Sequence, residues 1–167
     1  EPSASSPSPP STNSWNSMSE EHYQELTLEN QLCFPLYACA KEVVRRYKPF
    51  LDRLDLTYTQ YIAMLVLWEH RCLSAKELGA HLFLDSGTLT PLLKKLEQKQ
   101  YLTRRRDPED ERNLQICLTP QGLALRDEAL EVPKQMCACV ALPPEEAAQL
   151  GVLLKKLLSI MTEDAGE

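Results

Sequence analysis

The chain has 167 residues with 43% apolar content, which is enough to bury one sizeable core and fits one domain better than two. Its first residues lack the basic n-region and apolar h-region of a signal peptide, and no run of 18 consecutive apolar residues occurs. We therefore expect a cytoplasmic protein without a secretion signal or a membrane span. The net charge of −6 disfavours nucleic acid, but residues 94–106 hold six basic side chains and one acidic one, a local stripe that is compatible with DNA.

The N-terminal end differs in composition from the rest of the chain. Residues 1–17 are rich in Ser and Pro and have no periodic apolar pattern, so burial cannot offset the entropy of ordering them. We predict a disordered extension over residues 1–17 and a single domain over residues 18–167.

A first helix is predicted from apolar residues at helical spacing: Leu28, Leu32, Leu36, Val43 and Tyr47. We expect it to start near Thr27 and to end before Pro49. Pro35 would cost about 3 kcal/mol deep inside such a helix. A later start of the helix is therefore the alternative, and it would bring Cys33 closer to the helix N-terminus.

The next three helices open with capping signals. Residues 57–60 have the form of a capping box ahead of the apolar stretch 61–68, which predicts a buried second helix. Residues 74–77 repeat this signal and open a short third helix, and Asp85 or Ser86 caps a fourth. One face of the fourth helix is apolar: Leu89, Leu92, Leu93 and Leu96. Three short helices joined by short turns are typical of a helix-turn-helix unit.

After Tyr101 the apolar pattern changes to that of strands. Residues 102–106 and 114–118 are short stretches in which apolar and polar residues alternate, and the polar segment 107–113 joins them. This pattern predicts a β-hairpin, or wing. The predicted fold class is therefore mainly α with a small β-hairpin wing, a winged helix-turn-helix.

Two further helices complete the chain. Thr119 and Pro120 supply an N-cap and a first-position proline for a fifth helix that ends near Pro133. A last helix follows Pro144 and carries a wide apolar stripe: Leu150, Leu153, Leu154, Leu157, Leu158 and Met161. The stripe is wider than one small core needs, so we expect a dimer interface built from the first and last helices. Burial of the stripe within the same chain is the alternative.

The chain contains six cysteines: Cys33, Cys39, Cys72, Cys117, Cys137 and Cys139. In a cytoplasmic chain of this size we expect them to be reduced at rest. There is no Cys-x-x-Cys pair, and the spacings of His70 with Cys72 and of Cys137 with Cys139 do not suit zinc. We therefore expect neither a metal nor a cofactor.

Several motifs together resemble the MarR-type winged-helix repressors: residues 76–79 (KELG), 84–93 (LDSGTLTPLL) and 110–112 (DER). Residues 28–34 and 56–61 narrow the resemblance to the organic-hydroperoxide-sensing branch, and it extends from about Leu26 to Thr162. The resemblance implies a homodimer on double-stranded DNA with an inverted-repeat operator. It also implies a DNA-binding lobe over about residues 57–118, between dimerisation helices in residues 19–50 and 119–163.

In this family the fourth helix is the recognition helix, whose first residues enter the major groove. The resemblance makes Ser86, Thr88 and Thr90 candidates for contacts to bases or phosphates, and Lys94 and Lys95 candidates for phosphate contacts. The alternative interpretation is an ordinary capped surface helix with solvated lysines.

In the wing, Arg112 matches the family's minor-groove arginine, and Asp110 matches the acidic residue that orients it. The alternative for this segment is a solvated turn of mixed charge. Arg104 and Arg106 are candidate phosphate contacts, because side chains alternate along a strand and Arg105 then points to the other face.

Cys33 is the candidate sensor, because a thiolate attacks a peroxide oxygen and becomes sulfenic acid. In the family, tyrosine hydroxyls of the second subunit hydrogen-bond the reactive sulfur. The matching residues here are Tyr47 and Tyr58, and Tyr37 lies one turn from Cys33. Without the resemblance, a small buried hydrophobic residue would be the usual interpretation of such a cysteine.

The second thiol is expected at Cys137 or Cys139, near the family's resolving cysteine, and would form a disulfide with Cys33 across the dimer. A small thiol that caps Cys33 is the alternative. Cys39, Cys72 and Cys117 are interpreted as core or incidental residues.

The leading hypothesis is a repressor that leaves DNA when an organic hydroperoxide oxidises Cys33. A second hypothesis is a MarR-type repressor released by a small aromatic ligand, with Cys33 a bystander. A thiol peroxidase is a third, but no Thr and Arg are grouped around Cys33 in the manner of peroxidases, so we expect no enzyme.

Overall fold

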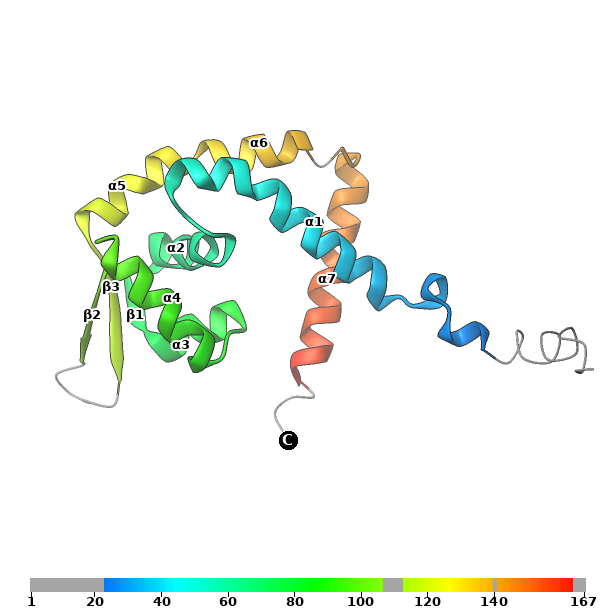
Figure 1. Ribbon diagram of the computed structural model, residues 1–167, viewed down its shortest axis with the longest axis horizontal. Coiled ribbons are helices and arrows are strands. Elements are labelled where there is room, and N and C mark those ends of the chain that lie inside the picture. The colour runs from blue at the N-terminus through cyan, green and yellow to red at the C-terminus, as the bar shows by residue number, and fades with distance from the viewer. Residues whose placement is uncertain (1–22, 107–112, 140, 164–167) are drawn as a thin grey trace, which may run out of the picture. The chain divides into compact units, whose positions relative to one another are not determined.

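The computed structural model describes residues 23–106, 113–139 and 141–163 (Figure 1). The chain divides into two units, residues 1–45 and 46–167. The helices are α1 (Cys33–Leu51), α2 (Tyr58–His70), α3 (Ala75–Leu82), α4 (Ser86–Gln98), α5 (Pro120–Ala129), α6 (Glu131–Cys139) and α7 (Pro144–Glu163), with short 3-10 helices η1 (Gln24–Leu26), η2 (Leu28–Asn30) and η3 (Asp52–Leu54). The strands are β1 (Cys72–Ser74), β2 (Leu102–Arg106) and β3 (Leu114–Leu118). The predicted fold class, mainly helical with a small β wing, is confirmed.

The three strands form an antiparallel sheet in the order β1-β3-β2 (Figure 1). Leu73 lies opposite Ile116, and Arg104 lies opposite Ile116 on its other side. The predicted bounds of β2 and β3 are confirmed. Strand β1 was not predicted, because three residues are too few to show an alternating pattern. The central strand is thus β3, and β2 is an edge strand of the sheet.

The core of the unit 46–167 lies where α2, α3 and α4 meet one face of the sheet. Its largest fully buried side chains are Leu51, Met64, Leu67, Leu78, Leu93, Leu96, Leu102 and Ile116. The polar end of Trp68 is satisfied as well, because its indole Nε1 donates to the carbonyl of Gly122 at 2.8 Å. This bond ties α2 to the start of α5 inside the core.

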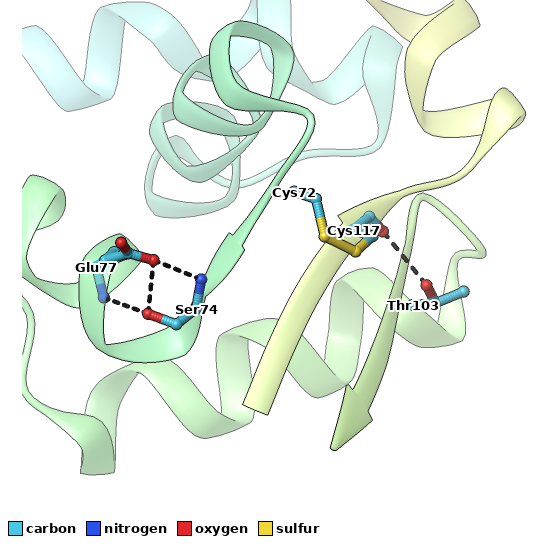
Figure 2. Close-up of a disulfide and its surroundings, with 5 residues drawn as sticks. All are labelled: Cys72, Ser74, Glu77, Thr103 and Cys117. Carbon is cyan, nitrogen blue, oxygen red and sulfur yellow. Dashed lines mark hydrogen bonds between the residues drawn. A yellow bond between two sulfur atoms is a disulfide. The ribbon is translucent and has the colours of Figure 1, made fainter. Parts of the chain in front are cut away.

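The capping signals of the sequence are confirmed at four helices, and the predicted N-cap Thr119 of α5 is one of them. Thr57 accepts from the N–H of Gln60, whose side chain accepts in turn from the N–H of Thr57, and Ser74 and Glu77 form the same box ahead of α3 (Figure 2). Asp85 is the N-cap of α4. Each box satisfies backbone donors that a helix start leaves without partners.

The predicted bounds of the first helix were wrong at both ends. Residues 24–30 form η1 and η2, and α1 starts only at Cys33, which places Pro35 in the first turn, where the missing N–H costs nothing. The later start that Pro35 suggested is therefore confirmed. At the other end α1 continues through Pro49 to Leu51, whose side chain is buried in the core.

The fifth helix also differs from the prediction, because it ends at Ala129 rather than near Pro133. A separate helix, α6, begins at Glu131 and has Pro133 in its first turn. A proline is tolerated there for the same reason as in α1.

No single helix among the described residues has the length and apolarity to cross a membrane. Within the same described ranges, one bent pair of helices, Pro120–Cys139 with Pro144–Glu163, passes by length and composition.

Candidate functional site

The start of α4 is held by the Asp85 carboxylate. Oδ1 accepts from the backbone N–H of Thr88 at 2.9 Å, and Oδ2 accepts from the Thr88 hydroxyl at 2.8 Å. These hydrogen bonds hold the pKa of the Asp85 carboxyl below its usual value. The first turn of α4 is therefore organised by one ionised carboxylate. The Thr88 hydroxyl donates its hydrogen to that carboxylate, and its oxygen can still accept a hydrogen bond.

We predict that replacing Asp85 with alanine weakens the start of α4, because the N–H of Thr88 loses its acceptor. Since the carboxyl pKa is lowered in the folded state, this stabilisation is present above the unfolded pKa and is lost as pH falls through the folded pKa. Urea unfolding at neutral and acidic pH measures it: the gap between wild type and Asp85→Ala should close in acid. Asp85→Asn, which keeps a capping oxygen, is the control, and a gap that does not depend on pH would contradict the prediction.

The predicted DNA contacts of α4 are exposed: Ser86, Thr88, Thr90, Lys94 and Lys95. The opposite face of the helix is buried through Leu89, Leu92, Leu93 and Leu96. The Thr90 hydroxyl donates to the carbonyl of Ser86 at 2.7 Å, one turn earlier. Among the described residues, neither lysine forms an ion pair. The helix thus presents short hydroxyls at its start and cations further along.

Of the wing residues, Asp110 and Arg112 lie outside the described residues. Arg105 and Arg106 are exposed, whereas the Arg104 side chain is only 23% exposed and binds Glu97 of α4. Glu97 was not predicted as a partner of Arg104, because nothing in the local sequence pattern shows that α4 and β2 bring these two residues together.

Cys33 is the first residue of α1 and is exposed. The backbone N–H groups of a helix's first turn point toward its N-terminus, a setting that favours anions. Tyr37 is also exposed, and the ammonium of Lys41 lies 5.3 Å from the centre of its ring. These three residues belong to the unit 1–45.

The other two tyrosines of the predicted site lie together in the unit 46–167. The rings of Tyr47 and Tyr58 are 4.9 Å apart, and the ring of Tyr61 lies 5.8 Å from Tyr47. Burial raises the pKa of Tyr47, and the neighbouring Tyr58 and Cys137 add to this rise, so the hydroxyl remains a donor at neutral pH. Tyr61 was not identified as part of this group, because in the sequence it belongs to the buried stretch of α2.

The candidate second thiols are both on α6. Cys137 is exposed and Cys139 is half-buried. The guanidinium of Arg46 donates to the carbonyl of Cys139 at 2.6 Å. This bond links the end of α6 to the part of α1 that belongs to the unit 46–167.

Cys72 and Cys117 form a disulfide on the sheet (Figure 2). They lie opposite each other on β1 and β3, with Cα atoms 4.1 Å apart, the close spacing of an antiparallel pair without mutual hydrogen bonds. The expectation that all six cysteines are reduced, with these two merely incidental, was therefore wrong. The register of β1 on β3, which the sequence analysis did not predict, brings the two thiols together.

No group of three or more His, Cys, Asp or Glu side chains within the described ranges could hold a metal ion.

Comparison with known proteins gives consistent matches. Residues 45–128 match the family model for the transcriptional regulator SarA/Rot. The organic hydroperoxide resistance transcriptional regulator of Bacillus subtilis (strain 168) is 45% identical over 142 residues, 85% of this chain and 97% of that protein.

Among solved structures, reduced AbfR bound to DNA, from Staphylococcus epidermidis, is 33% identical with a TM-score of 0.69, covering 84% of this chain and 99% of that chain. Disulfide-formed AbfR is 34% identical with a TM-score of 0.57, covering 83% of this chain and 97% of that chain.

Proposed function

Because the chain belongs to the MarR-type winged-helix transcriptional regulators, in their organic-hydroperoxide-sensing branch, we propose that it is a DNA-binding repressor that releases its operator when an organic hydroperoxide oxidises Cys33. Its relatives are named as regulators, and it is a regulator rather than an enzyme. The observation that carries the proposal is the 45% identity to an organic hydroperoxide resistance regulator over almost the whole of that protein.

DNA is read by the exposed face of α4. Ser86, Thr88 and Thr90 at its start reach base edges or phosphates in the major groove, and Lys94 and Lys95 bind phosphates. Arg106 adds a phosphate contact from the wing, and Arg112, oriented by Asp110, enters the minor groove. Structural neighbours solved on DNA, such as reduced AbfR, support this mode of binding.

The protein acts as a homodimer on an inverted-repeat operator. Large apolar side chains on α7 are exposed in the single chain, among them Leu150, Leu153, Leu154, Leu158, Ile160 and Met161. Within the described part of α7 no residue is buried. An apolar stripe of this length is stable in water only when another surface covers it, and the second subunit is that surface.

The signal is a two-step thiol reaction at Cys33. Its thiolate attacks the peroxide oxygen, which releases an alcohol and leaves a sulfenic acid. A second thiol, Cys137 or Cys139 across the dimer, then displaces water from that sulfur and forms a disulfide. Tyr47, whose pKa is raised by burial, and the adjacent Tyr58 donate to the reactive sulfur, and Tyr37 lies close in sequence.

The test is fluorescence anisotropy on DNA from upstream of the protein's own gene, before and after one equivalent of an organic hydroperoxide per subunit. We predict a roughly 10- to 100-fold loss of affinity for wild type, reversed by a reductant. Cys33→Ser should bind DNA normally and ignore the peroxide. Cys39→Ser, which removes another exposed thiol of α1, is the matched control and should respond like wild type.

If DNA binding of wild type is unchanged by the peroxide, Cys33 is a bystander and the ligand-controlled alternative takes its place. If wild type responds and Cys33→Ser does not, Cys137→Ser and Cys139→Ser separate the two candidate second thiols. The variant that lacks the resolving thiol no longer yields the covalent dimer on a non-reducing gel.

A further inference from the structure

Arg104 of the wing and Glu97 of the recognition helix are joined by three hydrogen bonds. The guanidinium donates to Oε2 of Glu97 through Nε at 2.8 Å and Nη2 at 2.6 Å. The backbone N–H of Arg104 donates to Oε1 at 3.1 Å. Both carboxylate oxygens are therefore used, one by the side chain and one by the main chain of the same residue.

The main-chain bond matters because of where Arg104 lies in the sheet. Among the described strands β2 pairs only with β3, so it is an edge strand, and N–H groups on its outer edge have no partner in these strands. Glu97 takes up one of them from the last turns of α4. The carboxylate thus replaces a strand partner and attaches the first wing strand to the recognition helix.

Buried side chains adjoin both residues of this contact. Leu96, beside Glu97, is fully buried, and Leu102, on the same face of β2 as Arg104, is 1% exposed. The guanidinium also holds the pKa of the Glu97 carboxyl below its usual value, so the carboxylate is charged at neutral pH. The Arg104 side chain is only 23% exposed and its charge is matched by a carboxylate, which leaves little of it for a phosphate.

We propose that Arg104 and Glu97 form a clamp that sets the position of the wing against α4. Arg104 is then a positioning residue for operator binding rather than a phosphate contact. This inference rests on the proposed DNA-binding function and replaces only the phosphate role expected for Arg104. Wing and recognition helix read different grooves, so their relative position determines whether both fit at once.

The two roles predict opposite results for Glu97→Ala. A clamp predicts that Glu97→Ala and Arg104→Ala each weaken operator binding by roughly three- to tenfold, and that the double variant is no weaker than either single one. The dependence of log affinity on log salt should keep the wild-type slope. A phosphate contact predicts a slope smaller by about 1 for Arg104→Ala, and tighter binding for Glu97→Ala, which would free a cation.

Anisotropy titrations at several salt concentrations measure these outcomes, with thermal unfolding as a check that each variant is folded. Arg105→Ala, on the other face of the same strand, is the control for the loss of any wing arginine. Exchanging the two charges, Glu97→Arg with Arg104→Glu, should recover part of the affinity. Tighter binding by Glu97→Ala, a reduced slope for Arg104→Ala or additive losses would each overturn the clamp.

Hydrogen exchange on the free protein keeps this test separate from the proposed function. Glu97→Ala should speed exchange of the Arg104 amide, because that amide loses its acceptor. If wild type binds no DNA but the exchange result holds, the proposed function fails while the link between α4 and β2 stands. An unchanged exchange rate of the Arg104 amide would refute the clamp, whatever the result of the DNA-binding titrations.

Discussion

Replacing Gly122 with alanine lowers the free energy of unfolding by about 3 kcal/mol. A Cβ at this position would lie 1.9 Å from the carbonyl oxygen of Tyr101, 2.8 Å from its carbonyl carbon and 2.9 Å from Cδ2 of Leu118. Two of these atoms are backbone, so α5 as a whole has to move away from the turn before β2. That movement also disturbs the hydrogen bond from Trp68 to the Gly122 carbonyl.

Urea unfolding followed by circular dichroism measures this loss. Gly151→Ala is the matched control: Gly151 is also helical, and an added Cβ there meets nothing within 4 Å in the described residues, apart from its own stretch of helix. The control should be neutral or slightly stabilised, because alanine favours a helix over glycine. A Gly122→Ala protein as stable as wild type would contradict the close approach of α5 to Tyr101.

The second large effect is expected from the Cys72–Cys117 disulfide. The two cysteines are 45 residues apart in sequence, and the loop that they close contains α3, α4 and β2. A cross-link of this span restricts the unfolded chain, so replacing both cysteines with serine should lower the free energy of unfolding by about 2–4 kcal/mol.

Comparison of unfolding with and without a reductant tests this directly. Wild type should be destabilised by the reductant, and the Cys72→Ser, Cys117→Ser double variant should not respond to it. The variant should still release DNA on peroxide treatment, because Cys33 is unchanged. If a non-reducing digest of wild type yields no linked peptide containing both cysteines, or if the reductant has no effect, the prediction fails.

The predictions from sequence succeeded where the signal is local. The capping boxes at Thr57 and Ser74 and the N-cap at Asp85 each depend on residues three apart, and the structure confirms all of them. The alternation in residues 102–106 and 114–118 likewise predicted both wing strands. These signals, with the motifs of residues 76–79 and 84–93, were sufficient for the fold class and the family.

Prolines were harder to interpret, because their effect depends on their place within a turn. Pro35 and Pro133 both lie in first turns, where a helix needs no N–H from them, so one helix begins later and another ends earlier than expected. Pro49 does not end α1, since the burial of Leu51 holds the following residues in place.

The sequence by itself therefore determined which elements form and which faces are apolar, since a helix or strand period is set by neighbours along the chain. Only the tertiary structure decided which distant residues meet. The register of β1 on β3 joined Cys72 to Cys117, and the return of β2 toward α4 joined Arg104 to Glu97. Such pairs depend on how separate elements pack, and no spacing within one element encodes them.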